Sequence, residues 1–195
     1  MPKNVEFYYD FGSPTSYLAY KRLPELCKKH NAELVLKPVL LGGIFKATNN
    51  VPPGAVPAKG RYMLNDMARF ARRHDIKMRF NPNFPLNTLT LMRCAFAAIT
   101  MNKIDEYNQA VFNAVWVAEK NMGELDILKT TLDDANLPTE ELLERAQTEM
   151  VKTALKDATA AAVERGVFGC PTLFVGDEMF FGQDRMEFVA EALSQ

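Results

Sequence analysis

The stretch Asp10–Tyr20, "DFGSPTSYLAY", reads as the end of a β-strand that runs directly into an α-helix. The preceding "NVEFYYDF" places apolar residues at every second position, as a strand does. Ser13 suits the N-cap of the helix, and Pro14 suits its first position, where a missing N–H costs nothing. Redox proteins often hold a Cys-x-x-Cys pair at such a helix start, but here the two positions are Ser13 and Ser16. The stretch therefore predicts a redox-type scaffold that lacks the redox pair.

The rest of the chain extends this pattern in three blocks. "AELVLKPVLL" predicts a second strand, which makes the opening a βαβ unit, whereas residues 42–60 are rich in Gly, Pro and Asn and predict a long loop. From Arg61 to about Gly166, apolar residues recur three and four apart, which is typical of helices. "PTLFV" and "MFFG" around "GDE" then predict an antiparallel hairpin. "DRMEFVAEAL" predicts a closing helix with Asp184 as its N-cap.

This order of elements, βαβ, a helical block and ββα, predicts an α/β thioredoxin-like fold with a large all-helical insertion. We expect residues 1–60 and 166–195 to form the thioredoxin-like domain and residues 61–165 to form the inserted helical domain. A chain of 195 residues has room for one such core with a sizeable insertion.

Composition excludes several classes of function. The formal net charge is −1, so nothing draws the whole molecule to nucleic acid or to an anionic membrane, and the basic run "RFARRHDIKMRF" reads as a solvated helix face. The start has no signal-peptide pattern and no stretch is apolar enough to span a membrane, so we expect a cytoplasmic protein. Three scattered cysteines and two histidines indicate neither a disulfide framework nor a metal site, and His30 and His74 are predicted at helix ends.

Ser13 is the first candidate for chemistry. The start of a helix presents unpaired N–H groups and favours anions, and a serine there cannot form a disulfide. Its hydroxyl could instead donate to a thiolate that belongs to a ligand, a charge-assisted bond of roughly 1.5–3 kcal/mol, or about one to two pKa units. The alternative is that Ser13 only caps the helix. A hydrolase nucleophile is not indicated, because the G-x-S-x-G elbow is absent.

"GCPT" and "FFGQDRM" are the other candidates. A proline just before a hairpin strand of this fold is commonly cis and faces the helix start, so the backbone of Cys170, before Pro171, could pair with an extended peptide-like ligand. The alternative is a turn proline beside a small buried cysteine. No histidine close in sequence supports Cys170 as a catalytic thiol. Gln183 and Asp184, after Gly182, could receive the charged end of a ligand, and Asp184 could equally cap its helix.

Four stretches and the chain length carry a resemblance to a known family. They are "DFGSPTSYLAY", "LGGIFKATNNVPPGAVPAKGRY", "VFNAVW" and "GVFGCPTLFVGDEMFFGQDR". Together they resemble the 2-hydroxychromene-2-carboxylate isomerases and the kappa-class glutathione transferases, which are related to DsbA-type oxidoreductases. The resemblance covers essentially the whole chain. It implies glutathione as cofactor, a small aromatic or electrophilic substrate, and a homodimer.

The resemblance also implies roles for single residues. Ser13 would contact the glutathione sulfur, and Cys170 and Pro171 would hold the cysteinyl part. The segment implied to hold the γ-glutamyl end consists of Phe181, Gly182, Gln183 and Asp184. The loop residues implied to lie near glutathione are Asn50 and Lys59, and those implied to lie near the aromatic substrate are Lys46 and Phe84. Some of the isomerases have a tyrosine at the position of Phe84, so a phenolic contact is absent here.

The implied activity is a glutathione-dependent cis–trans isomerisation of 2-hydroxychromene-2-carboxylate to trans-o-hydroxybenzylidenepyruvate in aromatic catabolism. One alternative is a kappa-class transferase that conjugates electrophiles, because Ala55 and Val56 stand where isomerases of the naphthalene pathway carry an Asn-Arg pair. "VFNAVW" and "GDEMFFGQDR" are more similar to the isomerases. A second alternative is a non-catalytic, peptide-binding protein of thioredoxin fold.

Overall fold

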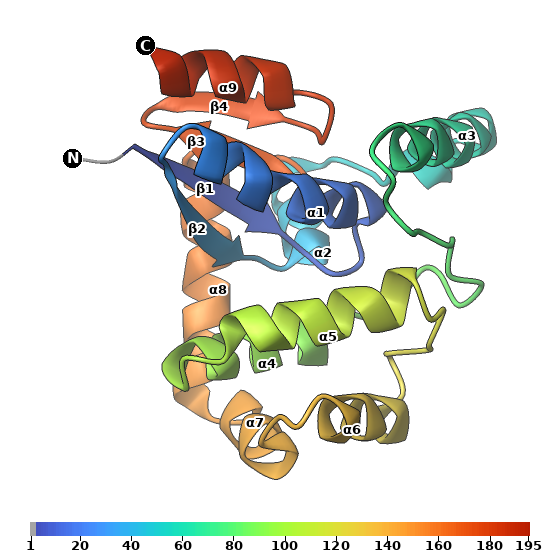
Figure 1. Cartoon of the computed structure of the whole chain (residues 1–195). Helices are drawn as coiled ribbons and strands as arrows, with labels where there is room; N and C mark the ends of the chain where they lie inside the picture. The colour runs from blue at the N-terminus through green and yellow to red at the C-terminus, as the bar shows by residue number, and fades with distance from the viewer. Residues whose placement is uncertain (1–2) are drawn as a thin grey trace.

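A four-stranded mixed sheet forms the centre of the upper half of the molecule (Figure 1). The computed structural model describes residues 3–195, and its strands lie in the order β2-β1-β3-β4. Strand β1 (Asn4–Tyr9) pairs in parallel with β2 (Glu33–Pro38) and antiparallel with β3 (Thr172–Val175). Strand β3 pairs antiparallel with the edge strand β4 (Glu178–Phe181). The predicted βαβ unit and hairpin are thus confirmed, and the fold is a DsbA-like thioredoxin fold.

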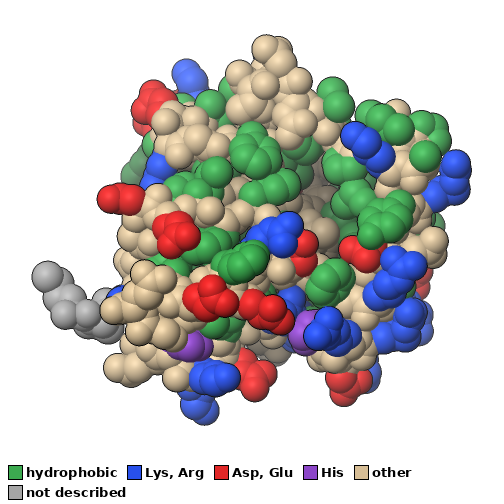
Figure 2. Space-filling model, turned by 90° about the horizontal axis from the view of Figure 1, so that it is seen from above, with side chains coloured by type: hydrophobic (Ala, Val, Ile, Leu, Met, Phe, Trp, Pro, Cys, Tyr) green, Lys and Arg blue, Asp and Glu red, His purple; other side chains and the backbone are tan. Residues whose placement is uncertain are grey.

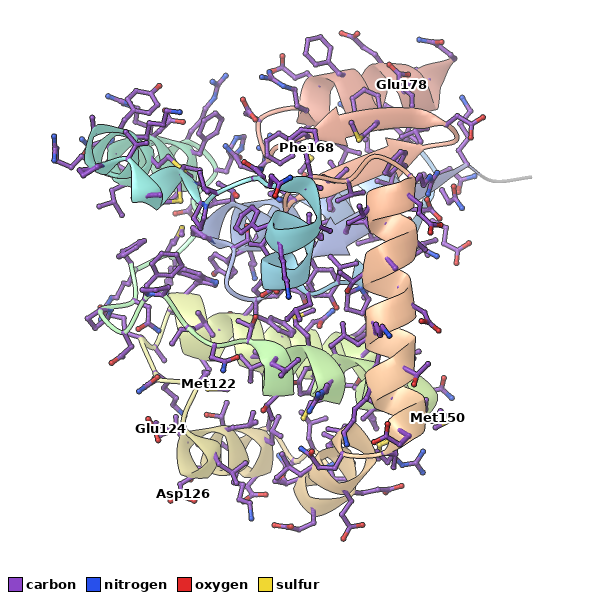
Figure 3. The ribbon with its side chains drawn as sticks, turned by 180° about the vertical axis from the view of Figure 1, so that it is seen from behind. Met122, Glu124, Asp126, Met150, Phe168 and Glu178 are labelled. Atoms are coloured by element: carbon purple, nitrogen blue, oxygen red, sulfur yellow. The ribbon has the colours of Figure 1, made fainter. Side chains whose placement is uncertain are left out.

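Helices cover both faces of this sheet. The remaining elements are α1 (Pro14–Lys29), α2 (Leu41–Thr48), the 3₁₀ helix η1 (Pro53–Ala55), α3 (Pro57–Arg73), α4 (Leu89–Thr100), α5 (Ile104–Trp116), α6 (Leu125–Asp134), α7 (Thr139–Ala146), α8 (Glu149–Glu164) and α9 (Met186–Ser194). Helix α1 lies in front of the sheet in Figure 1, and α2 and α8 lie on the opposite side, which faces the viewer in Figure 3. Helices α4 to α7 form the lower layer, and α3 stands to one side. Among the helices of residues 3–195, none is long and apolar enough to cross a membrane.

Helix α1 begins and ends as its sequence predicts. The Ser13 side chain accepts a hydrogen bond from the Ser16 N–H, and Pro14 occupies the first position of the helix. At the other end, His30 follows Lys28 and Lys29, whose positive charges favour a helix C-terminus. His74 ends α3 in the same way, so both histidines lie at helix ends as predicted.

The long loop predicted for residues 42–60 is wrong. Most of this segment is helical, in α2, in η1 and in the first turn of α3. Contacts with distant residues hold the start of α2, because Leu40 donates its N–H to Thr159 Oγ1 and Leu41 donates its N–H to Asp10 Oδ2. Ile44 is fully buried on the inner face of the helix. Tertiary contacts therefore outweigh the poor helix propensity of the local sequence.

The predicted N-cap of the last helix is also wrong. Helix α9 begins at Met186, and Arg185 rather than Asp184 precedes it. The Asp184 carboxylate lies 3.5 Å from an Arg185 guanidinium nitrogen. Asp184 therefore belongs to the turn between β4 and α9, where its charge is half exposed and accessible to a ligand.

One hydrophobic core joins the sheet to the inserted helices. It runs from Phe7 and Tyr9 of β1 into Phe112 and Trp116 of α5 and continues into α6 and α7. The Trp116 indole N–H donates to the Phe11 carbonyl at 2.9 Å, and Phe11 stands two residues before Ser13. The insertion therefore packs directly against the loop that leads into α1.

Candidate functional site

The side chain of Ser13 joins the start of α1 to the segment before β3. Its hydroxyl is almost fully buried and donates to the Cys170 carbonyl at 2.9 Å, while its oxygen accepts the Ser16 N–H at 3.1 Å. The Thr15 hydroxyl oxygen lies 3.2 Å from Ser13 Oγ and 3.4 Å from the Cys170 carbonyl oxygen. Ser13 therefore caps α1 and also bonds the segment before β3, 157 positions further along the chain.

The segment opposite Ser13 contains a cis peptide bond between Cys170 and Pro171, as the sequence predicts. The Pro171 carbonyl accepts the Gly182 N–H at 3.0 Å, which ties the end of β4 to this segment. Gly182 has φ of +106°, and a Cβ there would lie 2.5 Å from an Asp184 carboxylate oxygen. Glycine is thus required where the chain turns from β4 toward Gln183 and Asp184.

Arg22 of α1 fixes the position of this turn. One of its guanidinium nitrogens donates to the Gln183 carbonyl at 2.7 Å and to Gln183 Oε1 at 3.0 Å. Gln183 is buried, so these bonds satisfy polar atoms that water does not reach. Burial, and next the nearby Arg73, lower the pKa of Arg22. Arg22 therefore connects α1 to the segment implied to hold the γ-glutamyl end of glutathione.

Asp10 holds the loop between β1 and α1 in place. Its buried carboxylate accepts the Gly12 and Leu41 N–H groups, each at 2.8 Å, and the Thr88 hydroxyl at 3.1 Å. Burial raises the pKa of Asp10, and these three hydrogen bonds oppose that shift. Asp10 thereby joins three elements, namely the loop before Ser13, the start of α2 and the start of α4.

The thiol of Cys170 is unsuited to be a nucleophile. The residue is buried, and burial, with a smaller contribution from Asp10, holds the pKa of its thiol well above the ordinary value. Cys170 instead presents its backbone. Within residues 3–195, no hydrogen bond uses its N–H or the N–H of Thr15. The site thus offers two free backbone donors close to Ser13, whose own hydroxyl donates to the Cys170 carbonyl, and free backbone donors suit an anionic, peptide-like ligand.

Asn50 lies beside the same segment. Its side-chain amide donates to the Phe168 carbonyl at 2.9 Å, two residues before Cys170. The Phe168 ring lies 4.5 Å, between ring centroids, from the half-exposed ring of Phe181. Figure 3 shows Phe168 above α2, at the approach to the β3–β4 hairpin. Asn50 and Phe181, which come from two other parts of the chain, thus both contact Phe168, just before the cis-proline segment.

Lys46 and Lys59 are exposed, and no hydrogen bond or ion pair of residues 3–195 links either of them to Ser13 or Cys170. Lys46 is in the last turn of α2, and Lys59 is in the first turn of α3. Seen from above, a hollow separates α3 from the rest of the molecule, and hydrophobic side chains line both of its walls (Figure 2). The two lysines stay predictions as ligand contacts.

Phe84 packs against Trp116, whose indole bonds the loop before Ser13. Its ring centroid lies 5.3 Å from that of Phe80 and 6.1 Å from that of Trp116, which bonds the Phe11 carbonyl. Phe84 is half-buried and therefore keeps part of its ring accessible. Trp116 therefore stands between Phe84 and the loop that precedes Ser13, and a contact of Phe84 with a substrate stays a prediction.

The sequence analysis missed four residues of this arrangement: Asp10, Thr15, Arg22 and Thr88. Asp10 could have been found from the sequence, because a carboxylate directly after an apolar strand is expected to be buried and therefore to need hydrogen-bond donors. Arg22 and Thr88 act through contacts with residues 161 and 78 positions away, which no local pattern indicates. Among the described residues, no cluster of three or more His, Cys, Asp or Glu side chains could hold a metal ion.

Comparisons with known proteins find relatives along nearly the whole chain. The chain is 31% identical to human glutathione S-transferase kappa 1, over 100% of this chain and 92% of the relative. It is likewise 31% identical to a 2-hydroxychromene-2-carboxylate isomerase of Pseudomonas putida, over 98% of this chain and 94% of the relative. A solved structure of 2-hydroxychromene-2-carboxylate isomerase superposes with a TM-score of 0.88 at 27% identity, covering 98% of this chain and 94% of that one.

The DSBA-like thioredoxin domain matches residues 4–194, which is nearly the whole chain. The resemblance inferred from the serine motif and the cis-proline segment is therefore confirmed. The chain belongs to the DSBA-like thioredoxin domain family, as a relative of the 2-hydroxychromene-2-carboxylate isomerases and kappa-class glutathione transferases.

Proposed function

We propose that this protein binds glutathione beside Ser13 and uses it as the cofactor of a cis–trans isomerase of the 2-hydroxychromene-2-carboxylate type. The observation that carries the proposal is the 2.9 Å hydrogen bond from Ser13 to the Cys170 carbonyl. It brings a hydroxyl, a helix start and the backbone of a cis-proline segment together at one point. Positions 13 and 16 are serines, so a thiol at this site would have to come from a ligand.

The residues present fit glutathione. A γ-glutamyl peptide needs backbone partners for its cysteinyl part, donors for its sulfur and an acceptor for its amino group. The free Cys170 N–H supplies a backbone partner, and the Ser13 hydroxyl and the Thr15 N–H supply donors for the sulfur. The half-exposed Asp184 carboxylate, on the turn that Arg22 fixes, supplies the acceptor.

When bound, glutathione supplies a thiolate that adds reversibly to a conjugated double bond and leaves after rotation, so that it is regenerated. The Ser13 hydroxyl donates to the sulfur and, with the positive end of α1, favours its ionised form. The Phe84 ring packs against the aromatic part of the substrate. Lys46, in the last turn of α2, or Lys59, in the first turn of α3, holds the substrate carboxylate.

The test is to incubate the purified protein with 2-hydroxychromene-2-carboxylate, with and without glutathione, and to follow both the substrate and the thiol. Isomerisation that requires glutathione and leaves its concentration unchanged supports the proposal. Loss of the free thiol in step with the substrate contradicts it. A control without protein measures the spontaneous reaction.

A kappa-class transferase is the second candidate. It is supported by the 31% identity to the human kappa-class relative and by Ala55 and Val56 in the loop before α3. The same protein incubated with glutathione and a chlorinated nitroaromatic compound would then release a thioether. A non-catalytic peptide-binding protein would do neither, and saturating glutathione would not raise its melting temperature. A true ligand at 100 times its Kd stabilises the fold by about 2.7 kcal/mol.

A further inference from the structure

A second cleft lies apart from Ser13, between α1, the segment that follows α3, α5 and α6. Its volume is about 740 Å³, which is in the range of sites that bind small organic molecules. Figure 1 shows α5 between α1 above it and α6 below it. None of the residues that line this cleft belongs to the candidate site around Ser13 and the Cys170–Pro171 segment. The cleft is therefore a separate feature of the molecule.

The floor of the cleft is apolar and is formed largely by alanines. Ala110 and Ala114 lie one turn apart on α5, and Ala118 follows just after the end of this helix. Ala135, at the end of α6, lines the cleft as well. Because these side chains are short, they leave room for a ligand and offer it apolar contact. Such a floor suits the carbon skeleton of an organic molecule.

The rim of the cleft carries more positive than negative charge. Asp134 lies 3.7 Å from Lys120, and these two charges compensate each other. No ion pair of residues 3–195 involves the other charged residues of the rim, which are Lys21, Lys77 and Asp75. Burial, and next the nearby Arg22 and Arg73, lower the pKa of His74, so this residue adds no charge to the rim at neutral pH. One positive charge of the rim is thus left without a counter-charge.

Asn113 of α5 adds a polar group to the cleft. The residue is half-buried, and no hydrogen bond of residues 3–195 uses its side-chain amide. The Tyr17 hydroxyl, by contrast, is already engaged, because it donates to the Lys77 carbonyl at 2.8 Å. An amide NH2 group has two hydrogens to donate. Asn113 can therefore bond a carboxylate that the lysines attract.

We propose that this cleft binds a small organic monoanion, in which one carboxylate is joined to an apolar body. Lys21 and Lys77 supply the positive charge for the carboxylate, and Asn113 donates a hydrogen bond to it. The alanine floor contacts the apolar body. The inference goes beyond the proposed function and does not depend on glutathione, because the two sites share no residue.

The experiment titrates the isotope-labelled wild-type protein with three probes and follows its backbone and side-chain amide signals by NMR. The probes are 2-naphthoate and octanoate, which carry an aromatic and an aliphatic body, and 2-naphthamide, which has the same rings as 2-naphthoate but no charge. We expect a carboxylate to shift the signals of Asn113 and Ala118, and we expect 2-naphthamide to bind about tenfold more weakly than 2-naphthoate, the loss of one charge-assisted bond. The better carboxylate identifies the kind of body that the cleft accepts.

Two variants test the same cleft from opposite sides. The double variant Lys21→Gln/Lys77→Gln removes the charge, and Ala118→Phe fills the floor from an exposed position. Each should weaken binding of the carboxylate about tenfold or more. Lys156→Gln and Ala160→Phe, both at exposed positions of α8, are the matched controls and should bind as the wild type does.

Three results would overturn the inference. The first is that neither carboxylate at millimolar concentration moves the Asn113 signals, even if those of Gly182 in the candidate glutathione site move. The second is equal affinity for 2-naphthoate and 2-naphthamide, because the charge would then play no part. The third is an equal loss of affinity in the cleft variants and in their controls. The first two are decided on the wild type and hold even if a variant does not fold. Failure of glutathione to bind would overturn the proposed function and leave this inference intact.

Discussion

The hydroxyl of Ser13 lies 2.9 Å from the carbonyl oxygen of Cys170, although 157 positions separate the two residues in the chain. In a disulfide oxidoreductase the first of these positions would carry a thiol. Here the same position carries a group that caps α1 and bonds the cis-proline segment. A serine at this position cannot form a disulfide, and its hydroxyl instead joins the start of α1 to the cis-proline segment.

Replacing Ser13 should affect activity through the charge of the cofactor. In Ser13→Ala, we expect the pKa of the bound glutathione thiol to rise by about one to two units, and the rate at neutral pH to fall about ten- to a hundredfold. Loss of the N-cap should also lower the free energy of unfolding by about 0.5–2 kcal/mol. The pH profile of kcat/KM measures the first effect, and urea denaturation measures the second.

Ser16→Ala is the matched control for Ser13→Ala. Ser16 lies in the same helical turn and is equally buried, but its hydroxyl has no hydrogen-bond partner within residues 3–195. Its removal should leave the pH profile unchanged. Equal profiles for the two alanine variants would mean that Ser13 does not stabilise the thiolate.

Arg22→Met should weaken glutathione binding without slowing the chemical step. The variant loses the two hydrogen bonds that hold Gln183, so the turn bearing Asp184 becomes loose. We expect the KM for glutathione to rise about tenfold, consistent with one charge-assisted bond, and kcat to stay near that of the wild type. Arg145→Met is a suitable control, because Arg145 makes only exposed contacts, namely an ion pair with Glu141 of α7 and a hydrogen bond to the Thr100 hydroxyl of α4. A fall in kcat at unchanged KM would contradict the assigned role.

The three cysteines should react slowly with iodoacetamide in the native protein. Burial raises the pKa of Cys27 to about 11 and that of Cys94 to about 12, and it holds the pKa of Cys170 well above its ordinary value. Even Cys27 should then carry about a hundredfold less thiolate than a free cysteine. Mass spectrometry of timed samples, with urea-unfolded protein as the reference, checks this. Rapid native modification of Cys170 would reopen a role for its thiol.

Asp10 should make stability depend on pH. Because its folded-state pKa is raised above the ordinary value of 3.8, protonation favours the folded state, and its contribution to stability declines as pH rises above 3.8. The Asp10→Asn variant has no ionisable group at this position, so its free energy of unfolding lacks this dependence on pH. The difference in unfolding free energy between wild type and variant should therefore shrink from acidic to neutral pH, as urea titrations at several pH values would show. A constant difference would mean that the three hydrogen bonds cancel the effect of burial.

The fold was predictable where local pattern and tertiary structure agree. Ser13 and Pro14 mark the start of α1, and the alternation in β1 and in the hairpin marks the strands. Helix α2 was missed because its two glycines favour a loop, and its start is held by Asp10 and Thr159 from other parts of the chain. The start of α9 was misplaced because Asp184 is a residue type that often caps helices, whereas in the structure Arg185 directly precedes the helix.

The site was predictable in outline for the same reason. Ser13 and Pro171 carry recognisable motifs, and the structure brings their segments into contact. Arg22 and Thr15 lie in α1 as ordinary helical residues, and only their distances to Gln183 and to the Cys170 carbonyl give them a role. Sequence patterns report periodicity along the chain, whereas these roles arise from contacts across the fold.

The strand order β2-β1-β3-β4 also limits when the site can form during protein synthesis. A nascent chain that has not yet emerged as far as β3 can pair β1 only with β2, and one edge of β1 stays open. The inserted helices are made in this interval and pack beneath an incomplete sheet. The two sides of the candidate site, Ser13 and the Cys170–Pro171 segment, therefore come together only after β3 has been made and has left the ribosome.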